Sequence, residues 1–133
     1  LKEIEKSYPL TPIILQMKIL LLLKEKSWDV ALGLTQKLQQ MEPENGAGFI
    51  QGAYCLHEMK RTDEALVLLD GAPESVRSDA IYFYNMGCYQ AVIGDVDTAF
   101  DCLRKSFDMD ESLIDVARRD PDLAVLKDSI DSQ

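Results

Sequence analysis

The sequence has few of the residues from which catalytic and metal-binding sites are usually built. Its 133 residues include one histidine, three cysteines and one tryptophan. His57 has no cysteine or carboxylate at a metal-ligand or triad spacing, and Cys55, two residues away, points to a different face of the expected helix. The three cysteines are an odd number without the close pairing of a zinc or redox motif. We therefore expect no enzymatic activity, no cofactor and no metal site.

Long apolar runs and phosphate-binding loops are also absent. The most apolar stretch, residues 12–23, contains Gln16 and Lys18 and falls short of the roughly 20 residues that a membrane-spanning helix needs. The glycines at positions 46, 48 and 52 follow no predicted strand, so they are not typical of a phosphate loop. These absences disfavour a membrane-spanning role and nucleotide binding.

Basic residues are outnumbered by acidic ones. The chain has 23 Asp and Glu against 14 Lys and Arg, giving a formal net charge of −9, with the excess of acids beyond residue 45. This charge disfavours nucleic acid as a partner. Because nothing in the cysteine pattern requires oxidation, we expect buried free thiols and a cytoplasmic protein. The chain begins at Leu1 and not at methionine, so we expect it to be a piece of a longer or processed protein.

What the sequence does contain is a repeat of 34 residues. Ala31, Ala65 and Ala99 are separated by this interval, and the same spacing relates the segments SWDVALGL, RTDEALVLL and DVDTAFDCL. Each segment has a polar start, an acidic first turn and a small residue where two helices must approach closely. We expect all three alanines to be buried at helix–helix contacts.

Helix start signals divide each repeat into two helices. Thr11 and Pro12 give an N-cap followed by proline at the first helical position, and this helix should run to about Lys24. Gly94 and Asp95 give a tight turn followed by a cap. The other predicted helices begin after Ser27, Asn45, Asp79 and Asp120, and at Thr62. Residues 1–8 are amphipathic and are expected to be the tail of an earlier helix.

The period and its residues resemble the tetratricopeptide repeat, a helix-turn-helix unit that stacks into a superhelix. The third repeat carries the closest match, with Asn85, Gly87, Gly94, Asp95 and Ala99 at the family's positions. In the first repeat, Lys18 and Ile19 depart from the pattern. The second and third repeats have Arg77 and Glu111 at the position where the first repeat has the usual closing proline, Pro43. The resemblance implies an all-α fold, an α-solenoid of stacked antiparallel helix pairs in a right-handed superhelix. Its parts are a lead-in segment at 1–11, repeats at 12–45, 46–79 and 80–113, and C-terminal capping helices at 114–133.

In this family the first helix of each repeat lines a concave groove, so the resemblance also predicts a binding surface. The predicted groove residues are Ile13, Gln16, Met17, Leu20, Ile50, Tyr54, His57, Tyr84, Asn85 and Cys88. This set is largely apolar and aromatic. An alternative remains that some of these side chains pack between repeats or beneath the terminal helix, because spacing cannot separate a groove face from a second core face.

The predicted groove lacks the charged residues with which one subgroup of the family binds the carboxylate-ended tails of heat-shock chaperones. The corresponding positions hold Gln16, Leu20, Gln51, Ile81 and Asn85. Repeat proteins that hold an apolar or extended segment, such as bacterial secretion chaperones of this family, are a closer analogy. We therefore expect a scaffold or adaptor that binds an apolar segment of a partner protein. The alternatives are a self-association module that forms homo-oligomers and a regulatory domain of a larger enzyme or membrane protein.

Overall fold

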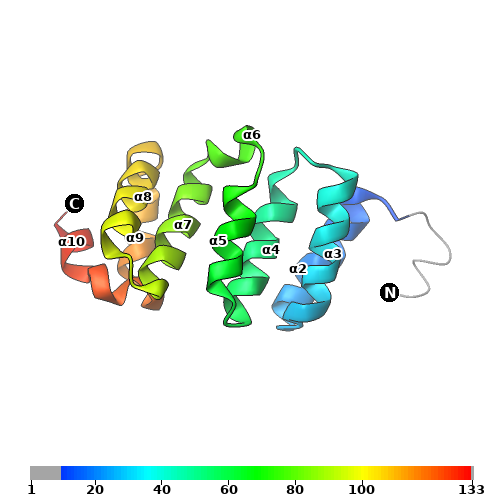
Figure 1. Cartoon of the computed structure of the whole chain (residues 1–133), viewed down its shortest axis with the longest axis horizontal. Helices are drawn as coiled ribbons and strands as arrows, with labels where there is room; N and C mark the ends of the chain where they lie inside the picture. Colours follow the sequence, from blue (N-terminus) through cyan, green and yellow to red (C-terminus); the bar gives the residue numbers. More distant parts are fainter. Residues whose placement is uncertain (1–9, 133) are drawn as a thin grey trace.

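The structure, a computed structural model, describes residues 10–132, and within that range it contains helices and no strand. The helices lie side by side along the long axis of the molecule (Figure 1). Their bounds are α2 (Pro12–Lys24), α3 (Trp28–Met41), α4 (Gly46–Glu58), α5 (Thr62–Asp70), α6 (Glu74–Arg77), α7 (Ala80–Ile93), α8 (Val96–Met109), α9 (Ser112–Arg118), the 3-10 helix η1 (Pro121–Leu126) and α10 (Lys127–Asp131). The amphipathic segment predicted at residues 1–8 lies outside the described residues.

Three helix pairs, α2 with α3, α4 with α5 and α7 with α8, form the body of the molecule and confirm the predicted all-α solenoid. Successive pairs contact each other through α3 against α4 and α5 against α7. Ala31, Ala65 and Ala99 are each 0% exposed, as the 34-residue spacing predicts. A methyl side chain at these positions lets the two helices of a pair approach closely.

Local signals account for the helix ends. Thr11 Oγ1 accepts a hydrogen bond from the backbone N–H of Ile14 at 3.3 Å, and Pro12 begins α2. Gly94 has φ of 99°, a left-handed conformation that glycine adopts without strain, and Asp95 then accepts from the N–H of Thr98 at 3.2 Å. Ser27 occupies the N-cap position of α3 without making a side-chain cap bond, so only its position matches the expectation.

Gly87 lies where α7 and α8 are in closest contact. A Cβ atom built on Gly87 would meet Leu103 Cγ at 2.7 Å and the carbonyl oxygen of Ala99 at 3.1 Å. Leu103 is 0% exposed, so its side chain has little room to move away. Gly33, on the exposed side of α3, has no atom within 4 Å of such a Cβ. Alanine substitutions at Gly87 and Gly33 therefore compare a crowded helix position with an open one.

We expect Gly87→Ala to lower the free energy of unfolding by about 1–3 kcal/mol, because the added methyl group overpacks the contact between α7 and α8. Gly33→Ala should raise it by about 0.5–1 kcal/mol, since alanine loses less backbone entropy in a helix and meets no neighbour. Urea unfolding followed by circular dichroism measures both. Stabilisation by Gly87→Ala would contradict the close contact of the two helices.

The segment after α8 leaves the repeat pattern and folds back on the array. Here η1 packs against α7 and α8, and α10 packs against α9 and η1. Leu123 is 1% exposed and Ile130 is 0% exposed, so their side chains belong to the main core. Asp120 caps η1 by accepting a hydrogen bond from the N–H of Asp122 at 3.0 Å. We call residues 120–131 the C-terminal segment.

Candidate functional site

The ten predicted groove residues all belong to α2, α4 and α7, the first helices of the three pairs. We call the surface that these residues mark the first-helix face. Four of its side chains are well exposed, namely Ile13 (72%), Met17 (59%), Leu20 (55%) and Tyr54 (40%). Four are half-buried, namely Gln16, Ile50, His57 and Asn85. The remaining two, Tyr84 and Cys88, are buried.

The exposed apolar part of this face is concentrated on α2. Ile13, Met17 and Leu20 follow one another at intervals of four and three residues, so they form one stripe along the helix. On the opposite side of α2, Leu15 and Ile19 are buried in a small core together with Leu38 of α3. Ile19 is a residue that departs from the repeat pattern, and its full burial shows that it serves this core.

Tyr84 and Cys88 lie beneath the C-terminal segment and not on an open surface. The Tyr84 hydroxyl donates to Asp120 Oδ2 at 2.7 Å, and the Cys88 thiol lies 3.6 Å from the same oxygen. Tyr84 is 6% exposed and Cys88 is 3% exposed. Burial is the main cause that raises the pKa of both groups, and the Asp120 carboxylate adds to it. The expectation that they line an accessible groove is therefore corrected, because chain that breaks the 34-residue period covers them.

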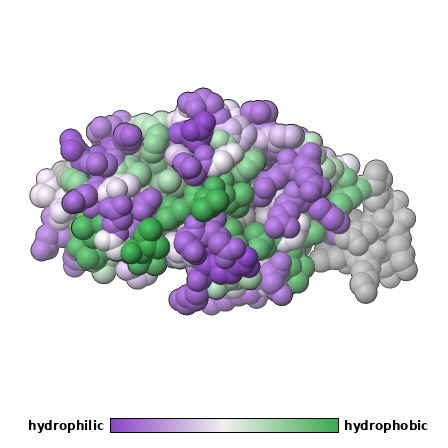
Figure 2. All heavy atoms as spheres, viewed as in Figure 1, coloured by the Kyte–Doolittle hydropathy of each residue, from purple (hydrophilic) through white to green (hydrophobic). Residues whose placement is uncertain are grey.

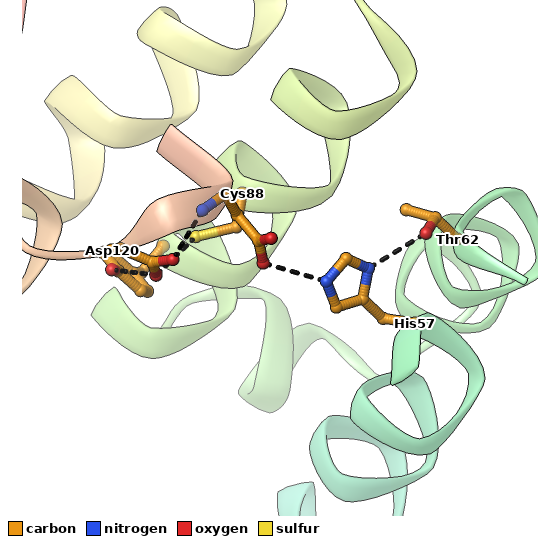
Figure 3. Close-up of polar contacts among 6 residues, drawn as sticks. His57, Thr62, Cys88 and Asp120 are labelled. Carbon is orange, nitrogen blue, oxygen red and sulfur yellow. Dashed lines mark hydrogen bonds and ion pairs between the residues drawn. The ribbon is translucent and has the colours of Figure 1, made fainter. Parts of the chain in front are cut away.

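His57 joins the C-terminal segment to the second repeat. Its Nε2 lies 2.9 Å from Asp122 Oδ2, and its Nδ1 lies 2.9 Å from Thr62 Oγ1 (Figure 3). Because a carboxylate only accepts, Nε2 carries the proton of the first bond. The His57 ring also packs on the Tyr89 ring, with centroids 4.7 Å apart. Sequence spacing missed Asp122, which is 65 residues away along the chain.

A hydroxyl, an imidazole and a carboxylate in one line have the connectivity of a catalytic triad. Thr62, however, is 8% exposed, and it lies at the buried start of α5, where a substrate cannot reach its oxygen. The two hydrogen bonds of His57 connect η1 to α4 and α5. Among residues 10–132 no group of three or more histidine, cysteine, aspartate or glutamate side chains is placed to hold a metal ion. In the same range no helix is long and apolar enough to cross a bilayer.

Tyr54 is the exposed aromatic residue of the first-helix face. Its ring meets Trp28 edge to face, with centroids 5.6 Å apart and planes at 88°, which fixes its orientation. Burial raises the pKa of Tyr54, and the charge of Glu58 and a hydrogen bond to it act in the same direction. Asp122 contributes a smaller effect of the same sign. The charges of Glu58 and Asp122 thus add to burial in disfavouring ionisation of the Tyr54 hydroxyl.

Two buried polar atoms have no hydrogen-bond partner within the described chain, Gln51 Oε1 and the Tyr89 hydroxyl. Gln51 lies three residues before Tyr54 on α4, so the two share one side of that helix. Tyr89 is 2% exposed and contacts His57. Both residues therefore lie close to named residues of the first-helix face. No sequence pattern predicts such unpartnered atoms.

The structure also has clefts on the outer side of the repeats, which the sequence analysis did not predict. One cleft of about 350 Å³ lies between α3 and α5, and a smaller one of about 210 Å³ lies between α5 and α7. Val67, which is 73% exposed, borders both clefts. Figure 2 shows apolar side chains gathered over α5 on this side of the molecule. We call it the outer face.

Comparison with known proteins gives a likeness in fold. No family model matches the chain, and no curated protein does. Among solved structures, MamA 41-end from Desulfovibrio magneticus RS-1 matches with a TM-score of 0.71 at 18% sequence identity. The match covers 92% of this chain and 69% of that one. It supports a helical-repeat fold of the tetratricopeptide type, and at this identity it shows the fold alone.

Proposed function

We propose that the protein is a scaffold or adaptor that binds a segment of a partner protein on its first-helix face. The observation that carries the proposal is the exposure of four large side chains on this face, Ile13, Met17, Leu20 and Tyr54. Three of them form a single apolar stripe on α2, and the fourth is an aromatic ring held by Trp28. Exposed apolar and aromatic surface of this kind is typical of protein–protein contact sites.

We propose that binding needs no enzyme chemistry, cofactor or metal, and that the partner is not a nucleic acid or a membrane. The net charge of −9 opposes anionic surfaces. The described cysteines are free, with Cys55 and Cys88 buried, and this is in keeping with a cytoplasmic location. Two alternatives are self-association through the same stripe and a regulatory role within a larger protein. Sedimentation of the purified domain at several concentrations tests the first.

Tyr54→Ala is expected to weaken partner binding by about 2 kcal/mol, roughly a 30-fold rise in Kd, because an aromatic anchor commonly dominates an interface. The partner is first captured from cells by crosslinking, and it is then titrated against purified variants by calorimetry. Tyr54 is 40% exposed and its ring lies on the surface, so the variant should remain folded.

Val67→Ala is the matched control, since Val67 is exposed on the outer face. It should leave the Kd within about twofold of the wild-type value, because a residue outside the contact contributes little. Loss of affinity in Val67→Ala together with normal affinity in Tyr54→Ala would move the binding site to the outer face and overturn the proposal.

A further inference from the structure

We propose that the C-terminal segment is an autoinhibitory ligand of the protein's own first-helix face. It occupies the part of this face that belongs to the third repeat, and a partner segment reaches that part only after displacing it. The inference rests on the proposed function, and it adds the regulation of the same face. It is carried by the register of the repeats, by the contacts of η1 and by the shortness of the helices in the segment.

The covered surface on the third repeat continues the open surface of the first two. Leu20, Tyr54 and Cys88 are separated by the 34-residue interval, so they hold equivalent positions on α2, α4 and α7. Leu20 and Tyr54 are exposed, whereas Cys88 is buried beneath Asp120. The segment therefore covers, on α7, the position at which α2 and α4 present an open side chain.

The end of the array is already covered by another element, α9. The first helices begin at Pro12, Gly46 and Ala80, so the interval places a fourth one close to residue 114. α9 lies at this place in the chain and contacts α8. In addition to α8, η1 contacts α7 and reaches α4 through Asp122. η1 thus spans two first helices, as a ligand in the groove of a helical-repeat protein does.

Donor side chains of the repeats bind two carboxylates of the segment. Asp120 Oδ2 accepts a hydrogen bond from the Tyr84 hydroxyl at 2.7 Å and lies 3.6 Å from the Cys88 thiol (Figure 3). Asp122 Oδ2 accepts from His57 Nε2 at 2.9 Å. The three donors are predicted groove residues. The chain itself therefore occupies side chains that were expected to contact a partner.

The segment has little helical stability of its own. η1 has six residues and α10 has five, fewer than the roughly 12–15 residues that an isolated helix needs. Their structure therefore depends on the repeats, against which Leu123 and Ile130 are buried in the main core. The segment is thus ordered by the surface beneath it, as a bound peptide is, and its release breaks none of the three helix pairs.

Displacement of the segment sets the apparent affinity of the partner. When only a small fraction of the molecules is open, the apparent Kd is the intrinsic Kd divided by that fraction. Asp122→Ala removes the hydrogen bond to His57 and should raise the open fraction about tenfold. It should therefore lower the apparent Kd of the captured partner about tenfold, a gain that loss of a purely structural bond would not give. Asp128→Ala, at an exposed position of α10, is the matched control and should leave the Kd unchanged.

Opening of the segment is measured without the partner. Labelling of Cys88 by iodoacetamide is followed at fixed pH by mass spectrometry, and labelling of Cys55, which is buried on α4, reports unfolding of the repeats. Asp122→Ala should speed labelling of Cys88 about tenfold and change that of Cys55 much less, because only the segment has been loosened.

A free peptide then tests whether the segment behaves as a ligand. The synthetic peptide RDPDLAVLKDSID, residues 119–131, is titrated into the Asp122→Ala protein up to about 1 mM, the effective concentration typical of a short tether. It should slow labelling of Cys88 to the wild-type rate in a saturable way. The same peptide with Leu123→Asp should give no protection, since a charged side chain cannot enter the apolar core.

The inference is overturned if Asp122→Ala speeds labelling of Cys88 no more than that of Cys55, if the free peptide gives no protection, or if the captured partner binds Asp122→Ala no more tightly than wild type. Those results would leave the proposed function standing on its own measurement, the Tyr54→Ala titration. If Tyr54→Ala leaves partner affinity unchanged while the peptide still protects Cys88, the proposed function fails and the third repeat remains a peptide-binding site.

Discussion

Raising the pH from 8 to above 11 is expected to unfold the domain cooperatively. The free energy of unfolding should fall first as thiols ionise in the unfolded chain and then more steeply as tyrosines ionise there too. Four buried groups cause this, Cys55, Cys88, Tyr84 and Tyr89, all 6% exposed or less. Burial raises the pKa of Cys55 to about 11, and it raises the pKa of the other three further above their ordinary values. In the folded protein these groups stay protonated over most of the range.

The direction of the pH effect follows from the number of protons that the folded and the unfolded protein bind. In the unfolded chain thiols ionise near pH 8.5 and tyrosines near pH 10, so above these values the unfolded state binds fewer protons than the folded one. The stabilisation is complete below pH 8.5 and is lost as the pH rises. Each group costs about 1.4 kcal/mol per pH unit, giving about 3 kcal/mol per unit for two thiols and more once the tyrosines ionise. A domain with about 10 kcal/mol of stability, in the middle of the typical range, would then unfold near pH 11.

Urea midpoints at a series of pH values measure the slope, and tyrosinate absorbance recorded in parallel reports ionisation. We expect absorbance of Tyr84 and Tyr89 to appear together with loss of helical circular dichroism. Tyrosinate absorbance that amounts to more than three of the five tyrosines, in a protein that keeps its full helix content, would show that Tyr84 or Tyr89 is accessible in the folded state. The Cys55→Ala variant should have a shallower slope between pH 9 and 10, since one ionisable thiol is missing.

The solenoid could be predicted from sequence because each repeat is specified by contacts close in the chain. The Ala31, Ala65 and Ala99 series reports helix pairs that are joined by short turns, and Thr11 and Asp95 act on N–H groups three residues away. Such signals repeat at fixed spacing, so three copies reinforce one another. The buried alanines and the starts of α2 and α8 therefore match the expectation.

The candidate site was predicted less well, because periodicity assigns a helix face and does not tell what covers it. Tyr54 and Cys88 are 34 residues apart and so hold the same position on α4 and α7, yet Tyr54 is exposed and Cys88 is buried beneath Asp120. The difference comes from the C-terminal segment, whose contacts with α7 and α4 join residues 32 to 65 apart. A chain segment outside the period gives no repeated signal from which these pairings could be found.

Leu123→Ala is expected to lower the free energy of unfolding by about 2–5 kcal/mol, because it removes most of a fully enclosed side chain and leaves a cavity. Leu123 is 1% exposed and packs in the main core together with residues of α7 and α8. Val125, two residues later on η1, is 66% exposed. Val125→Ala is therefore the matched control, and its effect should stay within about 0.5 kcal/mol.

The same pair of variants tests whether the C-terminal segment opens as a unit. Cys88 is 3% exposed beneath Asp120, so a thiol reagent reaches it only when the segment lifts. If η1 separates from α7 before the repeats unfold, Leu123→Ala should speed labelling of Cys88 much more than that of Cys55, which is 0% exposed on α4. Equal acceleration at both thiols would mean that the cap and the repeats unfold in one step. Unchanged labelling in Leu123→Ala would show that η1 does not protect Cys88.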